Sequence, residues 1–94
     1  MRISQEEITL LKDTLYSFSK EAKLYLFGSR IDDSKKGGDI GLLVISKELN
    51  YKDIRKLRVE FFKKFWEQKI DIVLDDGSCS DSFIKIIKQK AILL

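Results

Sequence analysis

The sequence contains no histidine and no proline, and its single cysteine is Cys79. Without histidine, this chain can build neither a Ser-His-Asp or Cys-His mechanism nor a zinc site that uses histidine. One cysteine forms no internal disulfide and no thiolate cluster, which fits a reducing cytoplasm. The lack of proline argues against a disordered linker. Chemistry must rest on carboxylates, hydroxyls, Lys, Arg and backbone amides, which suit Mg²⁺ and phosphate substrates.

Long apolar runs are also missing. No stretch approaches the roughly 20 apolar residues that span a bilayer, and the first residues turn acidic and polar without a signal-peptide core. We therefore expect a cytoplasmic protein with no membrane partner. The 94 residues leave room for one domain, so we treat 1–94 as a single domain. A net charge of +3 permits an anionic ligand but does not require one.

The apolar pattern predicts alternating helices and strands. Ser4 and Glu7 have the spacing of a capping box, and Asn50 is a suitable N-cap for a second helix. Three strands with interleaved helices imply an α+β domain, a small mixed sheet of about three strands packed with helices. The predicted elements are a helix over residues 4–22, strands over 23–27 and 39–46, a helix over 51–68, a strand over 69–74, and a helix that starts near residue 80 or 81 and packs through Phe83, Ile84, Ile87 and Ala91.

Three short features carry the candidate chemistry. Gly28-Ser29 ends the first predicted strand, where a glycine lets a phosphate approach the backbone, although a plain turn has the same pattern. Asp39 opens the second strand, whose apolar run over 40–45 indicates a central strand covered on both faces. Asp71 lies within an apolar strand, where a carboxylate is costly unless it is paired, hydrated or bound to a cation. If these two strands are neighbours, Asp39 and Asp71 converge.

Together these features resemble a known signature. Leu26-Phe27-Gly28-Ser29-Arg30, nine intervening residues after Ser29, and then Asp39-Ile40-Gly41-Leu42 are similar to the pattern of nucleotidyltransferases of the DNA polymerase β superfamily. The segment around Asp71 resembles the strand that carries the third carboxylate of that family. The short length resembles the minimal nucleotidyltransferase, or MNT, group in particular.

The resemblance implies a polymerase-β-like nucleotidyltransferase fold and Mg²⁺-dependent transfer of NMP from ATP or another NTP to a hydroxyl. By similarity, Gly28, Ser29 and the nearby backbone amides would hold the nucleotide phosphates, and Arg30 would add a phosphate contact or else face solvent. Asp39 and Asp71 would be the catalytic metal ligands. MNT proteins often act as antitoxins of HEPN-type ribonuclease toxins, so a HEPN-type partner or a homodimer is implied as well.

The sequence departs from the family pattern at Gly41, where the family has a second aspartate or a glutamate. Glycine offers no ligand atom, so a single Mg²⁺ held with the help of substrate phosphates is more secure than a two-metal site. Three explanations remain open: a weak or one-metal enzyme, replacement of the missing acid by Asp32 or Asp33, and a degenerate module that binds a nucleotide or a protein without catalysis. If the first holds, Gly41→Asp should gain activity.

Two further segments bear on partners. The apolar end Ile92-Leu93-Leu94 is a candidate contact or dimer surface, unless it folds back on the sheet. The segment over 51–68 is rich in Lys and Arg, but acids are interspersed and the sequence indicates no aromatic stacking platform. We therefore do not expect nucleic acid as a partner from the sequence alone.

Overall fold

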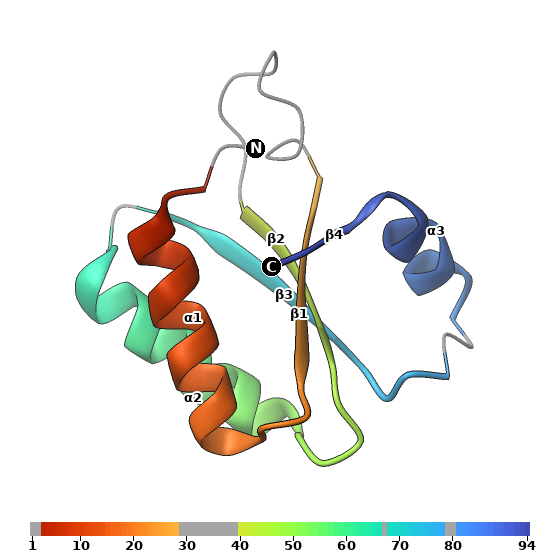
Figure 1. Ribbon diagram of the computed structural model, residues 1–94, viewed down its shortest axis with the longest axis horizontal. Coiled ribbons are helices and arrows are strands. Elements are labelled where there is room, and N and C mark those ends of the chain that lie inside the picture. The colour runs from red at the N-terminus through yellow and green to blue at the C-terminus, as the bar shows by residue number, and fades with distance from the viewer. Residues whose placement is uncertain (1–2, 29–39, 67, 79–80) are drawn as a thin grey trace.

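The computed structural model describes residues 3–28, 40–66, 68–78 and 81–94. Its elements follow the predicted chain order, with one short strand added at the end (Figure 1). No helix in these ranges is long and apolar enough to cross a membrane. In chain order the elements are α1 (Gln5–Phe18), β1 (Lys23–Phe27), β2 (Ile40–Ile45), α2 (Tyr51–Lys64), β3 (Ile70–Asp75), α3 (Ser82–Lys90) and β4 (Ile92–Leu93).

The four strands form one mixed sheet in the order β3-β2-β1-β4. β2 is antiparallel to β1 and parallel to β3, and β4 is antiparallel to β1. A parallel neighbour requires a crossover connection, which α2 supplies between β2 and β3. The predicted α+β class is confirmed, and β4 is an addition to the three expected strands. The chain end folds back on the sheet through β4, since Leu94 N donates to Leu24 O at 2.9 Å, but the side chains of Ile92 and Leu93 stay exposed, so their role as a contact surface stays a prediction.

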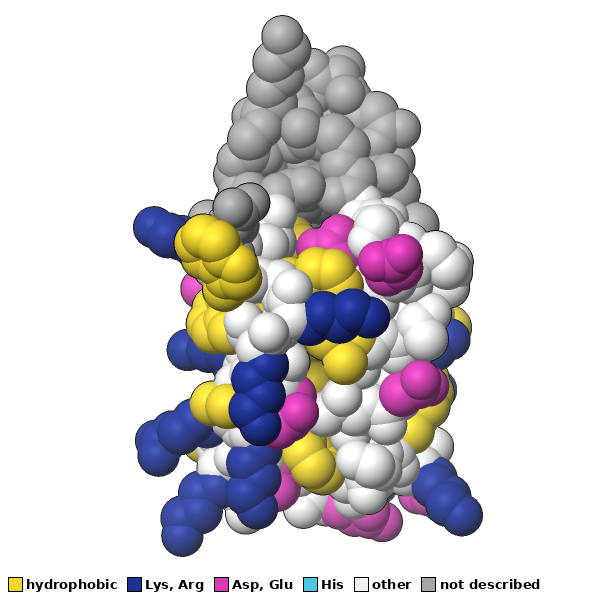
Figure 2. All heavy atoms as spheres, turned by 90° about the vertical axis from the view of Figure 1, so that its left-hand side faces the viewer, with side chains coloured by type: hydrophobic (Ala, Val, Ile, Leu, Met, Phe, Trp, Pro, Cys, Tyr) yellow, Lys and Arg dark blue, Asp and Glu magenta, His cyan; other side chains and the backbone are white. Residues whose placement is uncertain are grey.

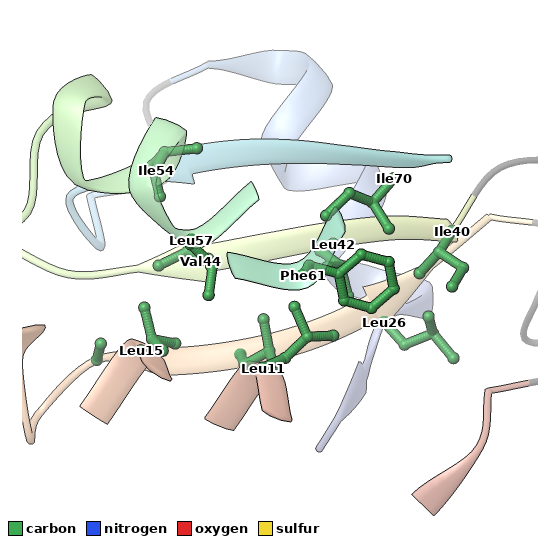
Figure 3. Packing of buried hydrophobic residues seen from close by; sticks show 12 residues of the cluster. Leu11, Leu15, Leu26, Ile40, Leu42, Val44, Ile54, Leu57, Phe61 and Ile70 are labelled. Carbon is green, nitrogen blue, oxygen red and sulfur yellow. The ribbon is translucent and has the colours of Figure 1, made fainter. Parts of the chain in front are cut away.

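The sheet is covered on both faces by helices. α1 and α2 lie on one side and α3 on the other (Figure 1). β2 is buried along almost its whole length, which confirms the prediction of a central strand. The larger core lies between the sheet and the α1/α2 layer (Figure 3). Its fully buried members include Leu11, Leu15, Leu24, Leu26, Ile40, Leu42, Val44 and Phe61.

The smaller core lies under α3. It contains Leu43 of β2 with Ile84 and Ile87 of α3, which lie three residues apart on one side of that helix. Phe83 was also expected to pack there, but its side chain is 57% exposed. A helix this short can bury only one stripe against the sheet, and Phe83 lies outside that stripe.

Both long helices end earlier than their apolar patterns suggest. α1 ends at Phe18 rather than Ala22, because Ser19 takes an extended backbone with φ −155° and starts the turn into β1. α2 ends at Lys64 rather than residue 68, where Phe65 leaves the helical region with ψ 52°. The third strand begins at Ile70 and extends to Asp75, one residue past its predicted end. Apolar side chains beyond a helix end still reach the core, so periodicity alone overestimates helix length.

Asn50 is a strong N-cap for α2, which yields a first prediction. Its side-chain oxygen accepts from Lys52 N at 2.9 Å and Asp53 N at 3.2 Å, while Asp53 Oδ2 accepts from Asn50 N at 3.0 Å. We expect Asn50→Ala to lower the free energy of unfolding by about 1–2 kcal/mol, because it leaves helical N–H groups without these acceptors. Thermal unfolding followed by circular dichroism should show a midpoint lower by about 4–8 °C per kcal/mol.

Asn50→Asp is the matched control, because aspartate also caps well. We expect it to lie within about 0.5 kcal/mol of the natural protein. Equal loss in both variants would contradict the capping role of Asn50.

Candidate active site

Of the candidate positions, the described ones, Gly28, Gly41 and Asp71, lie at one edge of the sheet, where β1 ends and β2 and β3 begin. β1 runs antiparallel to β2, and β2 runs parallel to β3, so these three strand ends must meet. The register places Phe27 opposite Gly41 in the β1–β2 pair, and Gly41 opposite Asp71 in the β2–β3 pair. The sequence-based condition for Asp39 and Asp71 to converge, that their strands are neighbours, is therefore met.

Gly28 directly follows β1 at this edge and has a left-handed backbone with φ +87°. Residues with a side chain rarely adopt that conformation, so the turn itself calls for glycine. A Cβ atom added there would meet no heavy atom within 4 Å among the described residues. The backbone of Gly28 is therefore exposed on an open side, as a close approach by a phosphate requires.

Asp71 is the second residue of β3 and is exposed. It points to the α3 side of the sheet, since its neighbours Ile70 and Ile72 belong to the core on the opposite side. The carboxylate is thus exposed to solvent and not buried in the sheet. In the part of the chain that the structure describes, no ion pair of Asp71 occurs. Its oxygens are therefore accessible to an incoming cation or ligand.

Gly41 lies between these two features and is tightly covered by Phe27. A Cβ atom built on Gly41 would lie 2.8 Å from the backbone oxygen of Phe27, and 2.9 and 3.0 Å from its Cε2 and Cδ2 atoms. Real Cβ atoms essentially never come closer than 3.0 Å to such atoms. The space that a side chain at position 41 would use is thus occupied by the ring and carbonyl of the facing residue on β1.

The other predicted site residues are Ser29, Arg30 and Asp39, and they lie outside the described residues, as do Asp32 and Asp33. Their roles stay predictions. Asp39 is covalently joined to Ile40, the first residue of β2, whose N–H donates to Lys69 O at 3.0 Å.

Among the described residues at this edge, Asp71 is the side chain suited to a magnesium ion. Within the described ranges, no group of three or more acidic, histidine or cysteine side chains could hold a metal. Asp71 supplies hard carboxylate oxygens, which Mg²⁺ prefers, and Mg²⁺ is commonly held by one or two carboxylates together with substrate phosphates. A two-metal clamp needs bridging anions. Gly41 provides none.

A separate hollow of about 470 Å³ lies at the opposite edge, where β1 begins and β2 ends. Its lining carries three lysines and three acids, so it has no net preference for an anion. Two hydrogen bonds with Ser78, from its backbone and its side chain, hold the pKa of the exposed Asp76 there below its ordinary value. The sequence analysis did not identify this hollow, because its lining combines residues of three connections with residues of β1, β2 and α3.

Comparison with known proteins agrees with this geometry. The family model of the nucleotidyltransferase domain matches residues 8–94, which include all the strands and helices from β1 onward and most of α1. A search of curated proteins finds no match. Because the matched range covers most of the chain and the observed sheet has the expected α+β form, the chain belongs to the nucleotidyltransferase domain family of the DNA polymerase β superfamily.

Proposed function

We propose that this domain transfers NMP from ATP, or another NTP, to a hydroxyl group with the help of Mg²⁺, and that Gly41 makes it a weak enzyme. One observation supports the proposal above others. Asp71 is an exposed carboxylate placed directly beside Gly41 in the parallel β2–β3 pair, at the edge where Gly28 turns away from β1 with an open backbone.

The residues of this chain have separate parts in the proposed reaction. The backbone at Gly28 and the hydroxyl of Ser29 bind the β- and γ-phosphates and orient the α-phosphate toward the acceptor. Asp39 and Asp71 would hold the nucleotide-bound Mg²⁺, which would supply positive charge to offset that of the phosphates. Asp71, which is exposed on the α3 side, would also accept the proton of an attacking hydroxyl. The acceptor oxygen bonds to the α-phosphorus and pyrophosphate leaves.

The acceptor in this proposal is a hydroxyl on a protein partner. The resemblance to MNT proteins points to a HEPN-type toxin, for which the domain would act as antitoxin. Because Asp71 is exposed, a side chain of a protein partner would have room to reach the α-phosphate beside it. A closed pocket would not leave that room.

A second candidate function has a specific observation in its favour. The ring of Phe27 fills the space above Gly41, so the site is packed as if no ligand at position 41 were needed. A module that binds a nucleotide or a partner without transferring NMP would have this property. ATP binding without label transfer to the partner would favour the module. Slow, Mg²⁺-dependent label transfer would favour the enzyme.

Asp71→Asn tests the proposal directly. We expect label transfer from α-labelled ATP to fall about 10²–10³-fold, because a charged group that acts at the reacting phosphate is lost. Binding of Mg²⁺-ATP, measured by equilibrium dialysis, should weaken at least about tenfold, whereas binding of ATP in EDTA should not change. The unfolding midpoint should stay the same, since the side chain is exposed.

Asp13→Asn is a matched control, because Asp13 is an exposed acid on α1 and the change in charge is identical. It should bind Mg²⁺-ATP as the natural protein does. If Asp71→Asn and Asp13→Asn behave alike in both measurements, Asp71 does not hold the metal and the proposed site is wrong.

A further inference from the structure

α2 carries more positive charge than the whole chain. Six of its residues are Lys or Arg and two are acidic, a net charge of +4, whereas the chain as a whole carries +3. All six cationic residues are exposed. Figure 2 shows many Lys and Arg side chains on the side of the molecule that carries α1 and α2. We call this surface the basic face of α2, and it consists of Lys52, Arg55, Lys56, Arg58, Lys63 and Lys64.

The acids that the sequence shows within this segment do not neutralise it. Asp53 is used in the capping box at the start of the helix. Glu60 pairs with Lys63 at 2.9 Å, and no other ion pair of α2 occurs in the described ranges. Five of the six cations therefore keep their charge available for a partner. The sequence analysis counted these acids against nucleic acid as a partner, and the structure gives each of them a local contact within α2 and its N-cap.

Exposed aromatic rings flank the basic face. Tyr51 at its start is 72% exposed, and Trp66, two residues past its end, is 75% exposed. Beside Trp66, an open hollow of about 630 Å³ lies between the end of α2 and the start of α1. Its lining consists of Phe65 and Trp66, the cation Lys64, the acid Glu7, and the polar side chains of Ser4 and Gln68. A large exposed indole next to a hollow and a lysine is a place where a planar group can stack.

We propose that the basic face of α2 binds single-stranded nucleic acid, with phosphates along its cations and bases stacked on Tyr51 and Trp66. The 14 residues of α2 extend over about 21 Å, the length of roughly six nucleotides of a stacked strand. This binding is separate from the proposed transfer reaction, because the basic face lies on the α1/α2 side of the sheet and Asp71 faces the α3 side.

Other polyanions fit the surface less well. An acidic protein partner would be expected to cover a contiguous apolar patch, whereas the exposed apolar residues here, Tyr51, Val59 and Trp66, are separated by charged side chains. A closed duplex offers phosphates but no free base faces for the two rings. A single strand offers phosphates to the cations and free base faces to the two aromatic rings. The sequence alone gave no stacking platform, because the exposure of an aromatic ring depends on which side of α2 the core takes.

The test measures binding of a fluorescein-labelled oligo(U) dodecamer by anisotropy at 50 and 200 mM salt. Each phosphate contact releases counterions from the strand and contributes about 0.7 to the slope of log affinity against log salt concentration. With five cations in contact, the affinity should fall about 100-fold between the two salt concentrations. K52Q/R55Q/K56Q leaves two of the five cations, so its affinity should fall only about sevenfold over the same range. It should also bind more weakly than the natural protein at 50 mM.

K85Q/K88Q/K90Q is the matched control, because it removes the same charge from exposed positions of another helix, α3. It should keep the 100-fold salt effect. Trp66→Ala should lose about tenfold affinity at both salt concentrations without altering the salt effect, as expected for a lost stacking contact. Circular dichroism should show that all variants are folded.

Three results would overturn the proposal. The first is no binding of the dodecamer at 50 mM salt. The second is an equal loss of affinity in the α2 and α3 triple variants, which would indicate net charge alone. The third is that anionic lipid vesicles displace the labelled dodecamer more strongly than unlabelled oligo(U) does, which would mean that the basic face of α2 binds a membrane surface.

Discussion

Gly41→Asp is expected to make the domain less stable and, per folded molecule, more active. The new Cβ atom would lie within 3.0 Å of the carbonyl oxygen and ring of Phe27, so the β1–β2 pair must shift or the ring must turn away. Overpacking of this kind costs about 1–3 kcal/mol. The added carboxylate would lie beside Asp71 in the β2–β3 register and supply the bridging ligand that the site lacks.

We expect Mg²⁺-dependent label transfer by Gly41→Asp to exceed that of the natural protein by about 100-fold, the scale of one electrostatic group at a reacting phosphate. The two effects are measured separately, stability by urea unfolding and activity at a temperature where both proteins are folded. Gly41→Ala is the decisive control, because it adds the same Cβ atom without the carboxylate. It should lose stability and gain no activity.

Phe27→Leu combined with Gly41→Asp tests the cause of the instability. Leucine removes the ring atoms that approach position 41 but keeps an apolar side chain for the core under α3. The double variant should be more stable than the sum of the single changes predicts, with a coupling of at least about 0.5 kcal/mol. If Gly41→Asp is no more active than Gly41→Ala, position 41 does not face the metal and the site assignment fails there.

This packing also explains why the sequence could not decide between a weak enzyme and a degenerate module. The sequence shows that a carboxylate is missing at position 41. It does not show that the ring of Phe27 fills that space, because this depends on the register between β1 and β2, which sets Phe27 opposite Gly41. In a family member with an acid at this position, the same phenylalanine would have to lie differently. The structure therefore shows that the missing ligand at Gly41 goes together with the position of Phe27, and both residues can be substituted.

The fold was more predictable than the site, for a physical reason. Burial on both faces leaves a continuous apolar run, so β2 could be identified from its sequence, and the alternation of Ile70, Asp71 and Ile72 correctly separated the two faces of β3. β4 was missed, because two residues are too few to show any alternation. Its pairing with β1 is a tertiary event that no local pattern records.

At the site, sequence spacing could propose which residues meet but could not give their surroundings. The sequence proposed only that Asp39 and Asp71 converge, and the strand pairing adds that Gly28 and Asp71 lie at the same edge. The exposure of Asp71 and the open space beside Gly28 depend on tertiary packing, which spacing does not record. The exposure of Trp66 has a similar origin: α2 ends at Lys64, earlier than its apolar pattern suggests, so Trp66 lies past the helix.

Phe61→Ala is expected to have the largest effect on stability. Phe61 is the largest of the fully buried side chains, and its ring lies 5.1 Å from the ring of Phe65 and 6.2 Å from that of Phe62, centroid to centroid. Figure 3 shows it pointing from α2 into the core among Leu42 and Ile40 of the central strand. Removing a buried phenylalanine side chain costs about 3–5 kcal/mol, the lost transfer energy plus the cavity left behind.

A domain of this size has a free energy of unfolding of roughly 5–14 kcal/mol, so this loss is a large share of the total. Chemical unfolding should show a lower midpoint with an unchanged slope, and the thermal midpoint should fall by at least about 12 °C. Val59→Ala is the matched control on the same helix, because its side chain is 48% exposed. It should change stability by no more than about 0.5 kcal/mol.

Phe61 and Val59 lie on opposite sides of α2, so their variants distinguish the buried side of the helix from its outward face. Phe61 anchors the helix to the sheet, whereas Val59 lies among the cations of the outward face. Below its unfolding transition, Phe61→Ala should still bind the oligo(U) dodecamer, because the charges and rings that contact it remain on a folded helix. If the variant is fully folded by circular dichroism yet has lost that binding, the dodecamer does not bind to the outward face of α2 and must contact another part of the molecule.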